Sequence, residues 1–377
     1  MNGCETDMNV YRIGFLVNPI AGMGGRVGLK GTDGHAYKLA LARGAQPESP
    51  QRALQFLNEV NAEGFQILAA PGIMGADIVF KSKHKERLAE IVGEIGAVTT
   101  ADDTRRIARL MLEKGIDLLV FVGGDGTARD VLDAIDQAVP VIGVPSGVKM
   151  YSSVFAVNPR AAAGLLEAFL RGEAAIVERE VLDIDEEAFR RDELVIRLYG
   201  YLKTVFHQEM TQEGKTLFSG IHEEENKEAI ARYVVENMSQ DTVYVLGPGS
   251  TVKAIAKALG LEYTLLGVDV VLNGRLLYKD AWEAHLLKLL QDYGNVKVIV
   301  TPIGGQGFIF GRGNQQLSPR FLSRIDKKDI IIVSTESKIR SLECLRVDTG
   351  DPAVDQRLRG YYKVIVDYNR YLVMKVV

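Results

Sequence analysis

The first half of the chain alternates short apolar runs with segments whose apolar residues recur at helical spacing. Each run predicts a buried strand, and each amphipathic segment between two runs predicts a crossover helix. Repeated β-α-β units of this kind are typical of a doubly wound parallel sheet. We therefore predict an α/β domain over residues 10–157. Its strands are expected at Tyr11–Val17, Gln66–Ala69, Asp117–Val122 and Val139–Val144, and its helices at Pro50–Glu63, after Thr100 and at Thr127–Gln137.

One helix of this half has a well-marked start. Thr100 is expected to be its N-cap, with a side-chain oxygen that accepts from a backbone N–H of the first turn. Asp103 lies in that turn, where a negative charge favours the positive end of the helix dipole. Gly115 is the predicted terminator.

The second half, residues 158–377, mixes strand and helix patterns less regularly. We predict a β-rich α+β domain there, which binds the substrate or dinucleotide and whose last strand can return to the first domain. The strand patterns are Ala174–Asp185, Glu193–Leu202, Thr242–Leu246, Tyr263–Leu272, Val296–Thr301, Ile330–Thr335 and Tyr362–Asp367, and the helical ones are Ala161–Arg171, Glu223–Met238, Thr251–Leu259 and Ala281–Asp292.

Composition and charge exclude several classes of function. The 377 residues include 45 Lys plus Arg and 49 Asp plus Glu, for a net charge of −4. Nucleic-acid binding and polybasic membrane anchoring both depend on a basic excess, so we expect neither nucleic acid nor a stable membrane anchor. The 38 glycines make up about one residue in ten, above the average usage of about 7%. They predict tight turns and loops that approach a ligand closely.

The cysteines and histidines form no recognisable site, and the sequence shows no targeting segment. Cys4 and Cys344 support no disulfide framework, and the five histidines show no zinc-ligand spacing. Residues 1–9 lack the basic start and apolar stretch of a signal peptide, and no apolar run has the length of a bilayer span. We therefore expect a cytoplasmic protein.

The strongest chemical signal is the loop that follows the strand Asp117–Val122. Gly123, Gly124, Asp125, Gly126 and Thr127 join this strand directly to a helix. Glycines let phosphate oxygens approach backbone N–H groups, and the helix start adds free donors and a positive dipole end. Asp125 can then take a proton from a substrate hydroxyl or hold Mg²⁺. The alternative is a tight turn in which Asp125 only caps the helix, and this loop alone does not decide between the two.

Two common phosphate-binding motifs are absent. Gly22–Gly28 follows a strand, but Val27 occupies the third glycine position of G-x-G-x-x-G. Lys30 is followed by Gly31 rather than by Ser or Thr, so the loop is not a Walker sequence. A redox Rossmann enzyme and a P-loop NTPase are therefore disfavoured.

Val122–Thr127 (VGGDGT) resembles the signature of the NAD kinase and diacylglycerol kinase superfamily. The neighbouring blocks look like those of the ATP-NAD kinase-like family, and the resemblance covers nearly the whole chain. This family combines an N-terminal α/β domain with a C-terminal β-rich domain. The blocks are Val17–Gly25 with Val27–Gly34, Gly143–Met150, Thr301–Phe308 with Gly311–Gln316, and Leu345–Pro352.

The resemblance implies an ATP-dependent kinase that uses Mg²⁺. Gly123, Gly124, Gly126 and Thr127 would hold phosphate, and Asp125 would activate the accepting hydroxyl. In an NAD kinase this is the 2′-OH of the adenosine ribose, and the product is NADP. Homo-oligomers are common in such enzymes, so a homo-oligomer is a further expectation. The Asn-Glu or Asn-Asp pair that NAD kinases carry has no clear counterpart here, which leaves NAD open as the acceptor.

Further residues are candidates for nucleotide binding. Gly249, Ser250 and Thr251 look like a degenerate form of the Thr-Gly-Ser-Thr stretch with which NAD kinases contact the dinucleotide; Thr251 can equally cap the helix that follows. Asn18 can donate to phosphate or cap a turn. Lys30 can neutralise phosphate, and Asp33 can hold a metal or a hydroxyl. The alternative for both residues is a surface loop without such a role.

Three functions remain open on the sequence. The first is a kinase of NAD or a related nucleotide, with ATP or polyphosphate as donor. The second is a kinase of another hydroxyl compound, such as a lipid, a polyol or a nucleoside. The third is a non-catalytic nucleotide-binding regulator, in which Asp125 would be only structural.

Overall fold

The computed structural model describes residues 10–29, 35–147, 150–184, 196–207, 210–211 and 221–377. Its contacts divide the chain into two compact units. Unit 1 comprises Met1–Gly22, Pro47–Ile184 and Ile196–Gln212; unit 2 comprises Met23–Gln46, Asp185–Val195 and Glu213–Val377. The expected boundary between residues 157 and 158 does not coincide with this division. The reason is that two further strands extend the sheet of unit 1, while residues 23–46 pack with unit 2.

Unit 1 is built on a seven-stranded sheet in the order β3-β2-β1-β4-β5-β7-β6. All neighbouring strands are parallel except β6 and β7, which form an antiparallel pair. The first five strands therefore form the predicted parallel sheet. The strands are β1 Tyr11–Val17, β2 Phe65–Ala69, β3 Leu88–Ile91, β4 Leu118–Gly123, β5 Val141–Pro145, β6 Ala175–Ile184 and β7 Ile196–Phe206.

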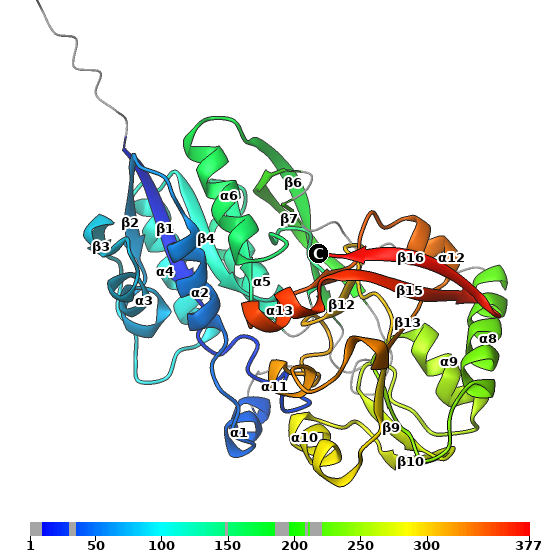
Figure 1. Ribbon diagram of the computed structural model, residues 1–377. Coiled ribbons are helices and arrows are strands. Elements are labelled where there is room, and N and C mark those ends of the chain that lie inside the picture. Colours follow the sequence, from blue (N-terminus) through cyan, green and yellow to red (C-terminus); the bar gives the residue numbers. More distant parts are fainter. Residues whose placement is uncertain (1–9, 30–34, 148–149, 185–195, 208–209, 212–220) are drawn as a thin grey trace, which may run out of the picture. The chain divides into compact units, whose positions relative to one another are not determined.

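Helices cover both faces of this sheet. On one face α2 and α6 pack against each other, with α3 beside them, and on the other face lie α4 and α5 (Figure 1). The central strands are buried on both sides, which explains their almost continuous apolar sequence. The helices are α2 Ser49–Glu59, α3 Ala76–Lys81, α4 Ala101–Glu113, α5 Asp125–Ile135 and α6 Pro159–Leu170, with short 3₁₀ turns at Gly72–Met74 and Lys85–Arg87.

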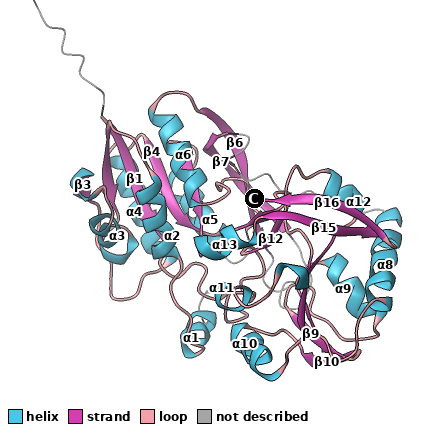
Figure 2. Cartoon of the chain, viewed as in Figure 1, coloured by secondary structure: helices cyan, strands magenta, loops and turns pink. Residues whose placement is uncertain are grey.

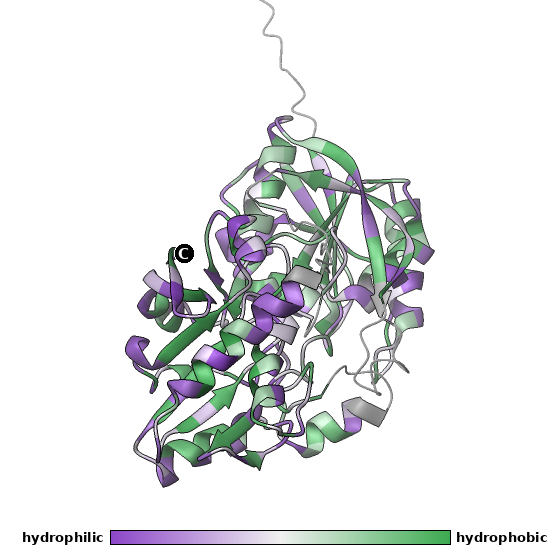
Figure 3. Ribbon diagram, turned by 90° about the vertical axis from the view of Figure 1, so that its right-hand side faces the viewer, coloured by the Kyte–Doolittle hydropathy of each residue, from purple (hydrophilic) through white to green (hydrophobic). Residues whose placement is uncertain are grey.

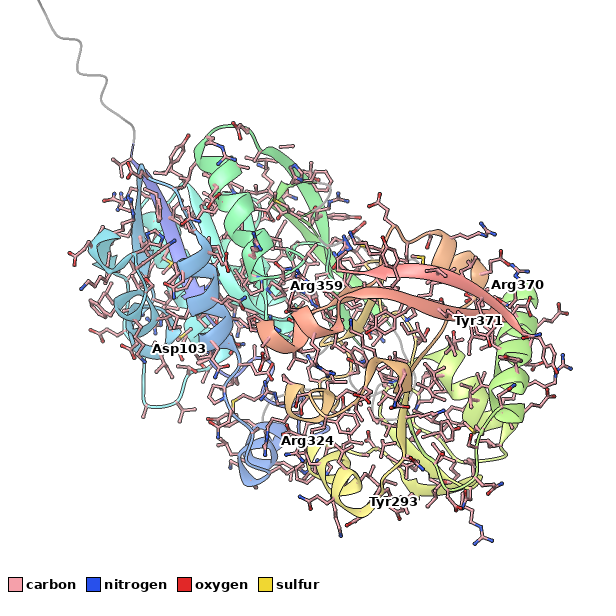
Figure 4. The ribbon with its side chains drawn as sticks, in the orientation of Figure 1. Asp103, Tyr293, Arg324, Arg359, Arg370 and Tyr371 are labelled. Atoms are coloured by element: carbon pink, nitrogen blue, oxygen red, sulfur yellow. The ribbon has the colours of Figure 1, made fainter. Side chains whose placement is uncertain are left out.

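The predicted start of α4 is confirmed. The Thr100 side chain accepts from the Asp103 backbone N–H, and the Asp103 carboxylate accepts from the Thr100 N–H at 2.9 Å. This reciprocal pair is a capping box, which satisfies two backbone donors at the helix end. Figure 4 labels Asp103 at this position. Burial raises the pKa of the Asp103 carboxyl, but its bonds to Arg106 and Thr100 outweigh that effect and the pKa lies below its ordinary value.

Unit 2 contains a second seven-stranded sheet, in the order β10-β9-β8-β11-β13-β15-β16. The four central strands β8, β11, β13 and β15 are parallel, and antiparallel strands extend both edges. The last strand, β16, pairs with β15 and is therefore an edge strand of the sheet of unit 2 (Figure 2). The strands are β8 Val243–Leu246, β9 Asp269–Leu272, β10 Arg275–Tyr278, β11 Val296–Val300, β13 Ile330–Val333, β15 Gly360–Asp367 and β16 Arg370–Val376; β12 Phe308–Phe310 and β14 Arg346–Val347 form a separate parallel pair.

Unit 2 also has two apolar cores, one on each face of its sheet. Alternate residues of β8 point to opposite faces: Tyr244 and Leu246 pack under α8 and α9, whereas Val243 and Val245 face α10, α11 and α13. Figure 3 shows the strands as mostly apolar and the helices as mixed. The helices are α1 His35–Ala42, α8 Ile221–Glu236, α9 Ser250–Ala258, α10 Glu283–Asp292, α11 Pro319–Leu322, α12 Glu336–Arg340 and α13 Pro352–Leu358, with a 3₁₀ turn at Lys327–Asp329.

The turn between β15 and β16 is joined to α8. Tyr371, which Figure 4 labels, is hydrogen-bonded through its hydroxyl to that of Tyr233 on α8. Arg370, labelled beside it, forms an ion pair with Glu336 at the start of α12. These tyrosines therefore pack within unit 2. No helix in the described part of the chain combines the length and apolar character needed to cross a membrane.

Candidate active site

The site in unit 1 lies at the carboxyl ends of β1 and β4. From β1 the chain passes to β2 on one side of the sheet, and from β4 it passes through α5 to β5 on the other side. The two loops therefore leave in opposite directions, which is the position where open α/β sheets bind ligands. The loop after β1 begins at Asn18, and the loop after β4 is Gly124 with the first turn of α5. The topology thus brings these two predicted segments together.

The turn from β4 into α5 depends on Gly123. A Cβ atom built on Gly123 would lie 2.3 Å from Thr127 Oγ1 and 2.5 Å from Thr127 Cβ. No side chain fits there without moving the helix start. Gly126 differs, because a Cβ atom on it would meet nothing within 4 Å. The fold therefore explains the glycine at 123, but packing does not explain the one at 126, where the space is open.

Asp125 is the first residue of α5 and is buried, with 7% of its surface exposed. Its Oδ2 accepts the Tyr151 N–H at 2.7 Å, and its Oδ1 accepts the Ser152 N–H at 3.0 Å. The N-cap of α5 is Gly124, so Asp125 does not cap the helix. An ionised carboxylate accepts hydrogen bonds at both of its oxygens, and one amide bond to each oxygen fixes the orientation of this one.

Asn18 and Thr127 meet across the two loops. Asn18 Nδ2 donates to Thr127 Oγ1 at 3.0 Å, and Asn18 Oδ1 accepts the Ile20 N–H at 3.2 Å. The Asn18 amide thus both closes the turn after β1 and holds the start of α5. It retains a second N–H donor, because a primary amide carries two.

A third loop, after β5, completes the site, and the sequence predicted no role for its residues Ser146, Tyr151 and Ser152. The Ser146 N–H donates to Gly123 O at 2.9 Å, and Ser146 Oγ lies 2.8 Å from Ser49 Oγ. A Cβ atom on Gly124 would lie 3.0 Å from Gly147 Cα, so the two backbones touch. The same loop leads to the Tyr151 and Ser152 amides that hold Asp125. Its only sequence signal is the family-like block Gly143–Met150.

Tyr151 is enclosed beside the carboxylate. It is 1% exposed, and burial together with the neighbouring Asp125 charge raises the pKa of its hydroxyl well above the ordinary value. The hydroxyl therefore stays protonated throughout the physiological range. We expect it to take no part as a base.

The remaining predicted residues fall into two groups. Gly249, Ser250 and Thr251 lie in unit 2, where Gly249 is the N-cap of α9 and Ser250 and Thr251 form its first turn. Gly249 adopts φ +113°, a conformation that side-chain-bearing residues rarely reach. Lys30 and Asp33 lie outside the described residues. Their predicted contacts with phosphate, metal or hydroxyl stay predictions.

The site offers little to a metal ion on its own. Within the described ranges, no three His, Cys, Asp or Glu side chains gather where they could hold one. Mg²⁺ in kinases is commonly held by one or two carboxylates and by substrate phosphates. Asp125, which lies beside the open space at Gly126, fits that mode, with the phosphates as the main ligands.

Two family profiles match the sequence. Residues 13–174 match the ATP-NAD kinase N-terminal domain, and residues 239–376 match the ATP-NAD kinase C-terminal domain. Together the two matches cover most of the chain.

The chain belongs to the ATP-NAD kinase family.

Membership identifies the protein as a kinase and confirms the two-domain α/β fold that the sequence predicted. The N-terminal match contains all three loops of the site in unit 1, and the C-terminal match contains Gly249–Thr251. Searches of curated proteins and of solved structures gave no match to the chain.

Proposed function

We propose that this kinase transfers the γ-phosphoryl group of ATP to the 2′-hydroxyl of the adenosine ribose of NAD, giving NADP. One observation carries the proposal: the Asp125 carboxylate is held by two backbone amides at the edge of a glycine-lined helix start. Family membership supports ATP and NAD as the two substrates. The proposal includes Asp125 as general base.

The phosphates of ATP would lie on the first turn of α5. The N–H groups of this turn have no partner within the helix, and the helix dipole is positive at this end. Gly126 is exposed and has open space above it, so an oxygen of the phosphate can approach the backbone closely. The Thr127 hydroxyl, which accepts from Asn18, belongs to the same first turn of α5.

The chemical step is a displacement at phosphorus. Asp125 accepts the proton of the 2′-hydroxyl while the ribose oxygen bonds to the γ-phosphorus, and the bond from that phosphorus to the β–γ bridging oxygen breaks. ADP leaves, and the proton remains on Asp125 until it passes to solvent. Mg²⁺, when bound with ATP, would neutralise the negative charge on the phosphoryl group that is transferred. The chain's own contribution is orientation and proton removal.

The test replaces Asp125 with Asn, which has the same shape and keeps one acceptor oxygen for the Tyr151 or the Ser152 amide. Loss of a general base typically costs about 100–10,000-fold. We expect the turnover of Asp125→Asn to fall by that factor, with ATP affinity changed by less than about tenfold. Steady-state kinetics with NAD, ATP and Mg²⁺ and a separate ATP titration measure both quantities. An unchanged turnover number would refute the assignment.

The acceptor and the donor are tested separately. Wild-type protein is assayed with labelled ATP, or with polyphosphate, over NAD, NADH, nucleosides, polyols and lipids. Phosphorylation of NAD at the 2′ position is the expected result. Labelling of a lipid or polyol instead would support the second function that the sequence leaves open. ATP binding without turnover on any acceptor would support a regulator.

A further inference from the structure

The two amides that hold Asp125 come from a segment without regular secondary structure. Tyr151 and Ser152 lie between β5 and α6, and neither residue belongs to a helix or a strand. Both are buried, at 1% and 0% exposed. In a helix or a strand the backbone ladder fixes the direction of each N–H group, whereas here other contacts must do so. The direction of the Ser152 N–H therefore depends on what holds this segment in place.

The Ser152 hydroxyl ties this segment to β6. Its Oγ accepts the Leu182 N–H at 2.9 Å and donates to Leu182 O at 3.1 Å. A serine hydroxyl carries one donor and two acceptor sites, so these bonds use its donor and one acceptor on a single partner residue. The same serine donates its backbone N–H to Asp125 Oδ1 at 3.0 Å. One residue thus connects the backbone of β6 to the Asp125 carboxylate.

The next residue, Ser153, is bound to the same strand. Its N–H donates to Glu180 O at 3.0 Å, and its hydroxyl donates to the Glu180 carboxylate at 3.0 Å. Ser153 is also 0% exposed. Glu180 and Leu182 are two positions apart, and residues at that spacing direct their backbone groups to the same side of a strand. The segment therefore runs along one side of β6 and is bound to it at two successive points.

The hairpin of β6 and β7 is bound to α5 as well. The two strands contain a β-bulge whose extra residue is Tyr199, and a bulge redirects a side chain out of the regular alternation. The Tyr199 hydroxyl donates to Asp133 Oδ1 at 3.0 Å, in the last turn of α5. A Cβ atom on Gly200 would lie 2.7 Å from Leu132 Cδ2, so strand and helix are in close contact. The hairpin thus holds α5 near its end and, through the segment after β5, at its first residue, Asp125.

A structural role and a positioning role for Ser152 differ in what they predict. By satisfying two backbone groups of β6 the hydroxyl stabilises the fold, and this alone would make Ser152 a structural residue. Its hydroxyl and its N–H belong to one residue, however, so a shift of the hydroxyl away from Leu182 also turns the N–H relative to Asp125. A general base must lie within hydrogen-bond reach of the proton that it accepts, and a displacement of about 1 Å can lower a rate about 100-fold. The positioning role therefore predicts a loss of turnover beyond any loss of stability.

We propose that Ser152 is a positioning residue for phosphoryl transfer: its hydroxyl, bound to Leu182, sets the direction of the amide that orients the Asp125 carboxylate. The inference rests on the proposed function, in which Asp125 is the general base. In this role Ser152 acts through Asp125 rather than on the substrate. The strand β6, which the sequence assigned to the second domain, belongs to unit 1 and supports the base through its backbone.

The experiment is a double-mutant cycle of Ser152→Ala and Asp125→Asn in the full chain. Steady-state kinetics are measured with ATP, Mg²⁺ and NAD, or with the acceptor that the wild-type screen identifies. Ser152→Ala removes both bonds to Leu182 and is expected to lower kcat by about 10–100-fold, with the KM for ATP changed by less than about threefold. In the Asp125→Asn background the same change should lower kcat by less than about threefold, because the group through which Ser152 acts is already lost.

Ser82→Ala is the matched control. Ser82 is 5% exposed, and its hydroxyl likewise donates to a backbone carbonyl, that of Val79 at 2.8 Å, and accepts a backbone N–H, that of His84 at 3.1 Å. The His84 ring contacts Phe65, the first residue of β2, so this serine lies at the end of the sheet opposite the site. Ser82→Ala should lower the melting temperature about as much as Ser152→Ala, since both lose two neutral hydrogen bonds, but should leave kcat within about twofold of wild type.

The outcomes separate this inference from the proposed function. Ser152→Cys keeps the size of the side chain and weakens both bonds, because a thiol is a weak donor and acceptor. Its kcat should lie between those of wild type and Ser152→Ala, and it carries the cycle if the alanine variant does not fold. Wild-type kcat in the folded Ser152 variants, or equal losses in the two backgrounds, would overturn the positioning role while Asp125→Asn still shows its own loss. An unchanged kcat in Asp125→Asn would refute the base assignment and this inference with it.

Discussion

Gly123 ends β4 and Gly126 lies three positions further on in the first turn of α5, and only Gly123 is required by the fold. A side chain at 123 would overlap Thr127, whereas one at 126 would project into open space. A glycine in a helix is less favourable than alanine by about 1 kcal/mol, so Gly126 weakens α5 without a packing benefit. The proposed phosphate contact accounts for that cost, because a Cβ atom would occupy the approach of the ligand.

Gly126→Ala should therefore separate stability from function. We expect its free energy of unfolding to equal the wild-type value or exceed it by up to about 1 kcal/mol, from helix propensity. ATP affinity should fall by at least about tenfold, because the Cβ atom displaces a phosphate oxygen. Urea denaturation and ATP titration measure the two effects. Gly123→Ala is the comparison, with a clear loss of stability expected. Unchanged ATP binding in Gly126→Ala would argue against phosphate at this turn.

At the scale of elements, α9 is anchored to the sheet by a buried ion pair. Lys253 Nζ donates to Asp269 Oδ2 at 2.8 Å, and these side chains are 2% and 0% exposed. Asp269 also accepts from the Thr264 N–H, the Thr264 hydroxyl and the Asp280 N–H. Burial would raise the Asp269 pKa, but the Lys253 charge and the amide bonds outweigh it and hold the pKa below its ordinary value. The pair thus fixes the helix start that carries Ser250.

Lys253→Met should destabilise unit 2 strongly. Removing one partner leaves the Asp269 charge buried and uncompensated, which typically costs 3–5 kcal/mol. Thermal and urea unfolding measure the loss. Lys257→Met on the same helix is the matched control, because Lys257 is exposed and its pair with Glu228 spans 3.7 Å; we expect a change below about 1 kcal/mol. Equal effects of the two variants would contradict this account.

For the whole molecule, the two units follow one architectural rule. Each has a seven-stranded mixed sheet whose parallel centre is covered on both faces, and each has a switch point with a glycine-bearing loop and a helix start.

Stability also depends on buried charge within these layers. Asp130 on α5 is 5% exposed and forms an ion pair with Arg105 on α4. Burial raises its pKa to about 6, although Arg105 acts in the opposite direction.

This raised pKa predicts how stability depends on pH. An unfolded aspartate titrates near 3.8, so the folded state holds the Asp130 proton more tightly, and its contribution is fully present below that pH. The contribution is lost as pH rises toward about 6, and by pH 7 the loss amounts to roughly 2–3 kcal/mol. Asp130→Asn should therefore gain stability relative to wild type between pH 4 and about pH 6–7. Urea denaturation of both proteins across this range tests it; a pH-independent difference would contradict it.

Much of the fold could be predicted from local patterns. The strand Tyr11–Val17, the capping box at Thr100 and the helix α8 follow from periodicity and helix-cap chemistry that lie within a few residues. The short elements α3, β12 and β14 were missed, since they depend on packing rather than on propensity. In the site, the glycine loop and Asp125 could be predicted, because a strand that ends in glycines before a helix is a local signal. The roles of these residues in catalysis stay predictions.

The sequence by itself determined the family, the alternation of strands and helices, and the chemical character of the loop at 123–127. Only the tertiary structure decided that the amides of Tyr151 and Ser152 hold Asp125, and that Thr301 contacts Gly249. It also decided which unit residues 23–46 join. The physical reason is that each of these contacts joins segments distant in the chain. Their partners are selected by sheet order and register, and no local pattern of residues encodes that order.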